Sequence, residues 1–531
     1  MKLLNVILAL VVSILIGFLV FEGGLRLTRF APEASANQFD SELGWSKRPG
    51  AVVTRSTSEF DLTLEINEQG LRDDPMPDPK KPEGVFRVVC LGDSFTMGYT
   101  VEREDLFLDI LETWWQLEGR KVEIINAGTE GYSTDQEARW LQLHGEELEP
   151  DLVLVFPYEN DLFWNGQKSY LRYPKPRYTA DGRLEARKLV DPGPHNWTEN
   201  WATTRALQFL IAGIRGGKTG PMWFVPSGGT EPILREFAPL LTEAPDFLAA
   251  APEDPLGRTR GALQALKKTS GELGAQLVIV PIPAHSDVSS DFAQSFGKRT
   301  LGLETEAWSP SNPVDFFLSA ATDLGIKCLD ARSTLRAREE GGDELYYRID
   351  WHLNPEGNRT LAQYLHDTLD SPTNAILPAS MAAKTRVAEP PSNSNSSFPP
   401  KWLLVYLGLW IVLSISYKLT YREEKLPAIA PKVAGMLALV FSVFFGGRYL
   451  AYNLPPEYAG ITLVAVVVGI IGFLLYKLGR RLGTVMELIA GFIARGHWYL
   501  LPLLIVLLSI GSLLVVAASS PFVAPFIYTL F

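Results

Sequence analysis

The chain has little of what builds metal sites and disulfide scaffolds. Its 531 residues include only two cysteines, Cys90 and Cys328, and six histidines. No C-x-x-C motif and no His/Cys pair with metal-ligand spacing occurs, so we predict neither a metal nor any other cofactor. Both cysteines lie in apolar runs and are interpreted as buried thiols. A disulfide between them stays an alternative if this part of the chain is exported, because pairing depends on geometry that a sequence does not contain.

Positive charge is also scarce over most of the chain. The whole sequence has 49 Lys and Arg against 60 Asp and Glu, a net charge of −11. Residues 401–531 hold ten basic and four acidic residues, which leaves 39 and 56 for residues 1–400. An acidic domain repels phosphate groups, so we expect no nucleic-acid partner. The hydrophobic content of 47% excludes the disordered and collagen-like classes.

Long apolar runs predict helices in a membrane. As a helix, residues 3–21 would span about 28 Å, close to the thickness of a hydrocarbon core. We therefore predict a retained signal-anchor helix at residues 1–22, with cleavage near Ala34-Ser35-Ala36 as the alternative. Residues 401–531 predict a membrane domain of about four transmembrane helices, over the runs 402–416, 433–447, 458–476 and 498–518.

Basic residues gather in two loops of this membrane domain, between 418 and 432 and between 477 and 495. Positive charge marks cytoplasmic loops. Five spans with a cytoplasmic N-terminus satisfy this rule, and they place the acidic domain outside the cytoplasm. Residues 371–400, rich in Pro, Ser and Asn, predict a flexible linker between that domain and the membrane.

Short apolar runs alternate with helical patterns between residues 38 and 370. This alternation is typical of a parallel sheet covered on both faces, a doubly wound α/β fold. A large insertion at about 162–258, rich in Trp, Tyr and Pro, follows the third strand and predicts a lid or substrate subdomain. The predicted strands are 86–91, 122–126, 152–156, 277–281 and 326–329, and the predicted helices are 134–148, 259–273, 315–324 and one that starts near Pro355.

Two reactive side chains lie beside predicted elements, one after the first strand and the other before the last helix. Ser94 follows the first strand, and a serine on a sharp strand-to-helix turn is held clear of the sheet as a nucleophile. His352, just before the last helix, is the candidate general base, and Asp350 would hold the imidazole in the required tautomer. Taken singly, each motif could equally be a helix cap or a turn.

Two further positions follow the second and third strands, at the edge where doubly wound sheets bind ligands. Gly131 lies in Asn126–Tyr132 and Asn160 in Glu159-Asn160-Asp161. The backbone N–H groups of Ser94 and Gly131 and the side chain of Asn160 would form an oxyanion hole for a tetrahedral intermediate.

The order Ser94, Gly131, Asn160, His352 resembles that of the SGNH (GDSL) hydrolase superfamily over residues 38–369. The resemblance implies a flavodoxin-like α/β fold and a serine esterase that works through an acyl-enzyme. Residues 43–45 and 66–72 resemble the lead-in of bacterial membrane-anchored members. Two features depart from the family pattern. Tyr158 stands where a glycine is usual, and one residue instead of two separates Asp350 from His352, as in relatives that acetylate exopolysaccharides.

Residues 497–531 resemble a small uncharacterised bacterial membrane-protein family associated with carbamoyltransferase and SGNH gene clusters. Its members are single-span, and the likeness implies a pathway shared with such proteins and allows membrane-protein partners. Together with the five apolar runs, it leads us to expect a multi-pass protein of the bacterial inner membrane. Its predicted substrate is an acylated envelope glycan or a small exported ester. We expect a hydrolase acting on O-acyl bonds. The alternatives are an O-acyltransferase of an extracellular polysaccharide and a non-catalytic binding or assembly module of a membrane complex.

Overall fold

The computed structural model describes residues 36–193, 253–297 and 308–381, apart from 57–58, 77–78, 171–172, 349, 372–373, 375 and 379–380, together with isolated residues elsewhere. Among these residues, no helix is long and apolar enough to cross a membrane. The five predicted spans fall wholly or largely outside the described part of the chain, so they stay predictions. The chain divides into two compact units, of which one comprises residues 33–195, 212–388 and 528–531 and contains the predicted site.

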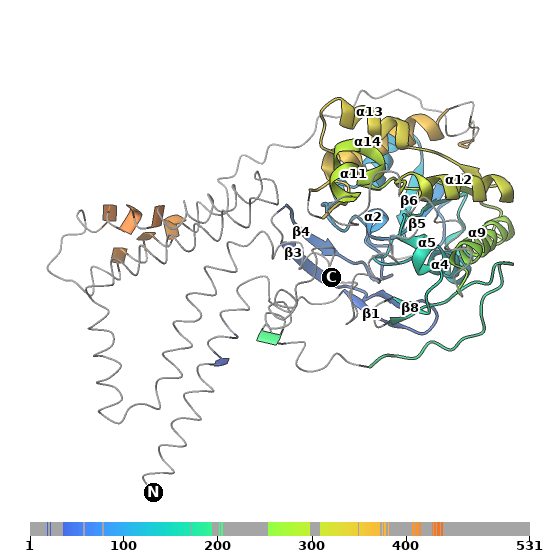
Figure 1. Ribbon diagram of the computed structural model, residues 1–531, viewed down its shortest axis with the longest axis horizontal. Helices are drawn as coiled ribbons and strands as arrows, with labels where there is room; N and C mark the ends of the chain where they lie inside the picture. The colour runs from blue at the N-terminus through green and yellow to red at the C-terminus, as the bar shows by residue number, and fades with distance from the viewer. Residues whose placement is uncertain are drawn as a thin grey trace, which may run out of the picture. The chain divides into compact units, whose positions relative to one another are not determined.

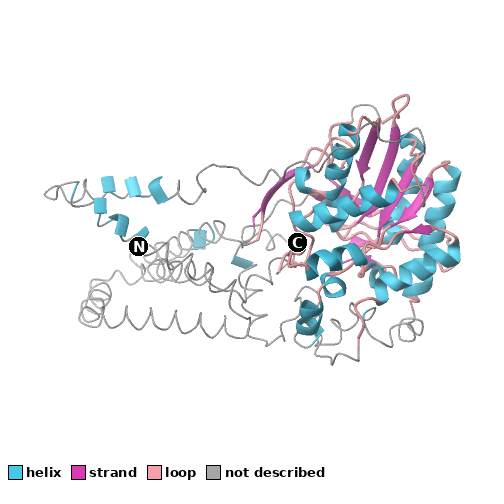
Figure 2. Cartoon of the chain, turned by 90° about the horizontal axis from the view of Figure 1, so that it is seen from above, coloured by secondary structure: helices cyan, strands magenta, loops and turns pink. Residues whose placement is uncertain are grey.

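A five-stranded parallel sheet forms the centre of this α/β unit (Figures 1 and 2). Its order is β11-β10-β7-β5-β6, which in chain order of these strands is 5-4-3-1-2, the flavodoxin-like arrangement. The predicted doubly wound sheet is therefore confirmed. The strand bounds are β5 Phe86–Gly92, β6 Val122–Asn126, β7 Leu152–Phe156, β10 Gln276–Ile279 and β11 Lys327–Cys328.

Alternating side chains of these strands build two cores on opposite faces of the sheet. Val88 and Leu154 face one core with Trp115 and Leu361, whereas Val89 faces the other. Because both faces are covered, the strands are apolar throughout. The first core is covered by α3 (Phe107–Leu117), α13 (Arg332–Glu340) and α14 (Pro355–Leu369), and the second by α4 (Thr134–Leu148), α9 (Pro255–Glu272) and α12 (Asn312–Leu324).

Residues before β5 form two antiparallel hairpins that the strand pattern did not predict. They are β1–β2 (Asn37–Asp40 and Gly44–Lys47) and β3–β4 (Val52–Ser56 and Asp61–Glu65). Apolar residues of β3 and β4 pack with Met97 and Tyr99, which lie just after the predicted nucleophile. The hairpin β3–β4, which precedes β5 in the chain, therefore packs directly against the residues that follow Ser94.

The insertion and the linker differ in part from their predicted bounds. After α5 (Asp161–Trp164), the insertion forms the short hairpin β8–β9 (Ser169–Tyr170 and Tyr173–Pro174) of the α/β unit. Residues 196–211 group instead with the other unit, where the Thr203 N–H and hydroxyl donate to Glu22 Oε2 at 2.9 and 2.8 Å. Ile376 and Met381 are buried in the α/β core, so that domain extends beyond residue 370, where the linker is predicted to begin.

The two cysteines are free thiols, Cys90 buried and Cys328 half-buried. Cys90 lies in β5 and Cys328 in β11, with β7 and β10 between them. Three strand spacings of about 4.8 Å put them beyond the reach of a disulfide. The disulfide alternative is therefore wrong.

Candidate active site

The candidate nucleophile, Ser94, stands on a tight turn between β5 and the short helix α2 (Ser94–Met97). Asp93 caps this helix, since its Oδ1 accepts the Phe95 N–H at 2.9 Å. A β-carbon on Gly92 would lie 2.0 Å from Thr96 Oγ1, so the turn has no room for a side chain there. Gly98 ends the helix at φ +76°, a conformation that glycine adopts without steric cost.

A buried arginine from the lead-in holds the other end of this turn. The Arg72 side chain is 1% exposed. It donates to the carbonyls of Met97, Gly98 and Val101, at 3.1 Å to Met97 and 2.7 Å to Val101. The Gly98 carbonyl also accepts the Val101 N–H at 3.3 Å, and a buried carbonyl that loses its donor is costly. The sequence pattern places Arg72 in a family-like motif, but only the fold shows that it supports the nucleophile.

The candidate base, His352, and its carboxylate partner, Asp350, lie just before α14, and Ser94 begins α2. Figure 1 shows both helices. His352 Nε2 lies 2.7 Å from Ser94 Oγ, and His352 Nδ1 lies 2.5 Å from Asp350 Oδ1. The carboxylate accepts from Nδ1–H, which leaves Nε2 free to accept the serine proton. The side chain of Asp350 is 3% exposed and that of His352 is 20% exposed, so the base can meet a ligand while its partner is shielded.

The single residue between Asp350 and His352 adopts an unusual backbone conformation. Trp351 has φ +67°, in the left-handed region, which costs about 1–2 kcal/mol for a residue with a β-carbon. Its ring packs edge-on against Phe292 and Phe296, with centroids 5.8 and 5.3 Å away. These contacts support the strained turn at Trp351. The turn lets the side chains of Asp350 and His352 meet. The shortened spacing is therefore compatible with a contact between Asp350 and His352.

An aromatic stack supports the imidazole and accommodates the other departure from the family pattern. The Phe95 ring stacks on His352 at 4.3 Å, and the Tyr158 ring lies 4.4 Å from Phe95. Tyr158 thus packs on the aromatic ring that itself lies against His352. Phe95 had no signal in the sequence beyond its place after Ser94.

The two remaining oxyanion-hole candidates lie on loops after the strands that flank β5. Gly131 has φ +74°, and a β-carbon there would lie 2.7 Å from the Tyr170 ring of β8. Asn160 precedes α5, and its carbonyl accepts the N–H groups of Phe163 and Trp164 at 3.0 Å. Since β6 and β7 both neighbour β5, the two loops and Ser94 share one edge of the sheet. That both donors converge on one oxygen stays a prediction.

Asp161, next to Asn160, ties these two loops together. Its Oδ2 accepts the Thr134 N–H at 3.0 Å and the Thr134 hydroxyl at 2.7 Å, at the start of α4. Burial raises the pKa of Asp161 and of Glu137 well above the ordinary carboxyl range. Repulsion from Asp93 adds to the shift of Asp161, and repulsion from Asp161 adds to that of Glu137. Burial also raises the pKa of Asp93 to about 6, although the His352 charge opposes this shift. The fold thus limits the negative charge that accumulates close to Ser94.

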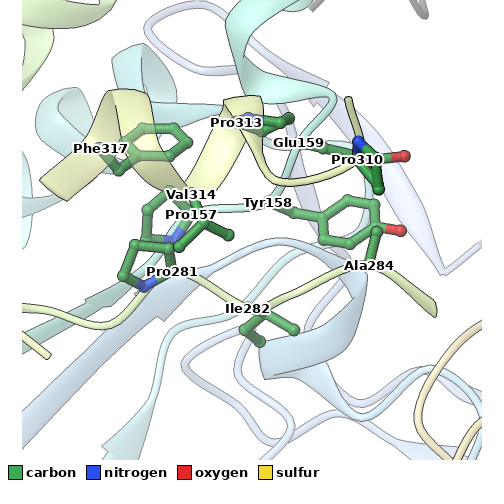
Figure 3. Close-up of a pocket in the computed structure, with 10 residues that line it drawn as sticks. All are labelled: Pro157, Tyr158, Glu159, Pro281, Ile282, Ala284, Pro310, Pro313, Val314 and Phe317. Carbon is green, nitrogen blue, oxygen red and sulfur yellow. The ribbon is translucent and has the colours of Figure 1, made fainter. Parts of the chain in front are cut away.

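A recess of about 200 Å³, including open space at its mouth, lies beyond Tyr158 (Figure 3). It follows the ends of β7 and β10, and prolines such as Pro157 and Pro281 line it. Its one carboxyl group is Glu159, whose Oε2 has no hydrogen-bond partner within the described residues. Burial, with a smaller contribution from Asp287, raises the pKa of Glu159 to about 8. A neutral carboxylic acid therefore stands next to Asn160 at neutral pH.

The other histidines within the described residues have structural contacts. His285 stacks between Phe292 and Tyr346, His366 Nε2 lies 3.1 Å from Glu118, and His144 packs on Trp140. His195 and His497 lie outside the described residues. In the part of the chain that the structure describes, no group of three or more His, Cys, Asp or Glu could hold a metal ion. The absence of a cofactor stays a prediction.

Comparison with family models gives two matches. Residues 241–394 match the model described as "SGNH hydrolase-like domain, acetyltransferase AlgX", a range that includes Asp350 and His352. Residues 482–531 match a family of unknown function, DUF5989. This second match covers the whole of the tail, residues 497–531, that resembles a small uncharacterised family, while its membrane location and gene associations stay predictions. A comparison with curated proteins gives no match.

Several solved structures are similar to about half of this chain. TesA is 12% identical, with 53% of this chain and 97% of that chain covered and a TM-score of 0.28. The acetyl xylan esterase AlAXEase is 13% identical (53% and 98% covered, TM-score 0.28), and the esterase EstA from Pseudoalteromonas sp. is 14% identical (53% and 96%, TM-score 0.26). The first family match and the strand order give the α/β unit an SGNH-like fold.

Proposed function

We propose that this protein acts on ester bonds through a covalent acyl-enzyme on Ser94. The observation that carries this proposal is the continuous chain from Asp350 Oδ1 through His352 to Ser94 Oγ, with separations of 2.5 and 2.7 Å. Ser94 attacks the ester carbonyl while His352 takes its proton. His352 then returns that proton to the leaving alcohol. Water or a second alcohol attacks the acyl-enzyme, and its proton passes to His352 as Ser94 is released.

The test is covalent labelling of the detergent-solubilised full chain with a fluorophosphonate probe. Such a probe reports an activated serine without requiring the natural substrate. We expect labelling of the wild type and none of Ser94→Ala, with a loss of at least 10³-fold in His352→Ala. Ser290→Ala, at the start of α11 (Ser290–Phe296), is a matched control that keeps full labelling. A folded wild type that does not react would overturn the proposal.

Acyl transfer to a sugar hydroxyl is the second candidate. The name of the matching family model, an acetyltransferase, and the one-residue spacing between Asp350 and His352 favour it. On this view the acceptor is an envelope glycan, and the apolar runs hold the α/β unit at the outer face of a bacterial inner membrane. Incubation with an acetyl donor and a glycan acceptor separates the two reactions. Acetylated acceptor supports transfer, and free acetate alone supports hydrolysis.

A non-catalytic assembly module is the remaining alternative, with membrane-protein partners recruited by residues 401–531. The paired Ser94 and His352 argue against it, because a binding module has no need of a base within hydrogen-bond distance of a serine. A normal cellular phenotype of Ser94→Ala, together with a defect on deletion of the gene, would support this module.

A further inference from the structure

The loop that carries the candidate base is held by a hairpin from the opposite end of the α/β unit's sequence. Glu59, in the turn between β3 and β4, accepts the backbone N–H of Asp350 on its Oε2 at 3.0 Å. The two residues are 291 positions apart in the chain. This hydrogen bond therefore joins the orienting carboxylate's own backbone to an element outside the central sheet.

The same hairpin also contacts the nucleophile side of the site. Arg55 of β3 is 5% exposed and donates to the Tyr99 carbonyl at 2.5 Å. Its guanidinium lies 3.3 Å from the centroid of the Tyr99 ring, and that ring is 6.0 Å from the His352 ring. The hairpin thus meets the segment after Ser94 through one residue and the base loop through another.

A third contact closes the arrangement. Phe60 packs against Tyr347 with ring centroids 5.3 Å apart, and the Tyr347 hydroxyl donates to the Thr100 carbonyl at 3.2 Å. The Tyr347 N–H in turn donates to the His352 carbonyl at 2.9 Å. The base loop and the segment after the nucleophile are therefore linked both directly and through the hairpin.

We infer that hairpin β3–β4 positions the catalytic base, with Glu59 as the positioning residue that fixes the Asp350–His352 loop against Ser94. This inference rests on the proposed function. The loop needs such support because Trp351 holds a strained conformation, which persists only where surrounding contacts over-determine it. The Glu59 carboxylate also adds a negative charge close to this pair.

Several charged or titratable groups face this pair from the elements packed around it. Asp93 lies at the α2 turn and Tyr99 follows that helix. Tyr347 belongs to the base loop itself. Burial raises the pKa of its hydroxyl, and the charges of Glu59 and Asp350 raise it further. Arg55 comes from the hairpin. Since all of them except Glu59 stay unchanged in a Glu59 variant, a shift of the pH profile reports the Glu59 charge.

The experiment measures the second-order rate of fluorophosphonate labelling of the full chain between pH 5 and 9. Glu59→Ala removes the acceptor, and we expect its rate to fall at least tenfold while its thermal unfolding temperature stays close to that of the wild type. Glu59→Gln keeps an oxygen acceptor but removes the charge. We expect it to keep most of the rate and to move the acidic limb of the profile down by about half a pH unit.

Glu65→Gln is the matched control, because Glu65 lies on the same hairpin in β4 and is exposed. Its profile should coincide with that of the wild type. A wild-type rate and profile in both Glu59 variants would overturn this inference alone. If Glu59→Ala fails to fold, an unshifted profile of Glu59→Gln overturns it. No labelling of the folded wild type would overturn the proposed function and this inference together.

Discussion

The nucleophile turn and the base loop reach the same site by different means. Ser94 follows a central strand, and its turn is held by backbone hydrogen bonds, the Asp93 cap and the buried Arg72. The base loop, residues 345–354 apart from 349, contains the strained Trp351 and one isolated β-bridge, between Tyr346 and Leu353. Leu345, Tyr346 and Leu353 anchor it in the core, and side chains of the hairpin and of α11 contact the turn at Asp350 and Trp351. The comparison teaches that a helix cap and a buried arginine hold the nucleophile turn, whereas side chains from distant elements complete the support of the base.

The largest effect on the labelling rate should come from removing the charge of the Asp350 carboxylate. Asp350→Asn keeps the size of the side chain but no longer favours the tautomer in which Nε2 accepts. We expect the labelling rate to fall by about 10³- to 10⁴-fold. Stopped-flow or time-course labelling measures this rate, with Asp343→Asn, two residues before the base loop, as the control. A loss under tenfold would show that Asp350 does not orient the base.

Next in size is the loss of one oxyanion donor on the nucleophile side. Asn160→Ala should lower turnover of an activated acetate ester by about 10²- to 10³-fold, because the developing negative charge loses a hydrogen bond. Asn165→Ala provides a comparison in the same segment, since Asn165 bonds to Thr259 and Asp135 and not to the site. Similar kcat/KM values for Asn160→Ala and the wild type would remove Asn160 from the oxyanion hole.

Arg72→Met tests whether the core holds the nucleophile turn. The substitution keeps much of the apolar stem but removes the guanidinium donor from the carbonyls of Met97 and Val101. We expect a loss of about 2–3 kcal/mol in the free energy of unfolding. Urea unfolding of the full chain in detergent, followed by tryptophan fluorescence, measures the change. Glu59→Ala should cost far less stability, because Glu59 is only half-buried. Equal losses would contradict the contrast between these two supports.

Trp351 tests the strain in the base loop. Trp351→Ala and Trp351→Asn both remove the ring, but asparagine tolerates positive φ better than alanine does. We expect both variants to lose activity and the asparagine variant to retain a few-fold more. The labelling rates of the pair, measured side by side, decide this. A higher rate for the alanine variant would mean that the left-handed conformation is not needed for activity.

The smallest effect concerns the basic side of the pH profile. Glu159 is neutral below its pKa of about 8 and becomes negative above it. A negative charge next to Asn160 opposes the developing oxyanion, so kcat/KM should decline a few-fold as the pH rises past 8. Glu159→Gln should remove this decline without changing the rate at pH 6. A decline that persists in the variant assigns it to another group.

Much of the fold was predictable because its strands are buried on both faces and its helices carry regular apolar stripes. The first three strands and α4 agree with their predicted ranges to within a residue. The hairpins β1–β2 and β3–β4 were missed because short, half-exposed strands give little periodic signal. Ser94, His352 and Asp350 were found as motifs. Arg72 lies in a motif that was noted without a role for this residue, whereas Phe95 and Glu59 carry no signal of their own.

The sequence by itself determined the doubly wound sheet and the polar residues at its carboxyl edge, because both follow from local apolar patterns and from the order of the strands. Only the tertiary structure decided how the base reaches the nucleophile. Ser94 and His352 lie 258 residues apart, and the hydrogen bond between them depends on a strained tryptophan and on a glutamate in a distant hairpin. Such contacts depend on side chains that meet only after the chain has folded, so no local pattern records them.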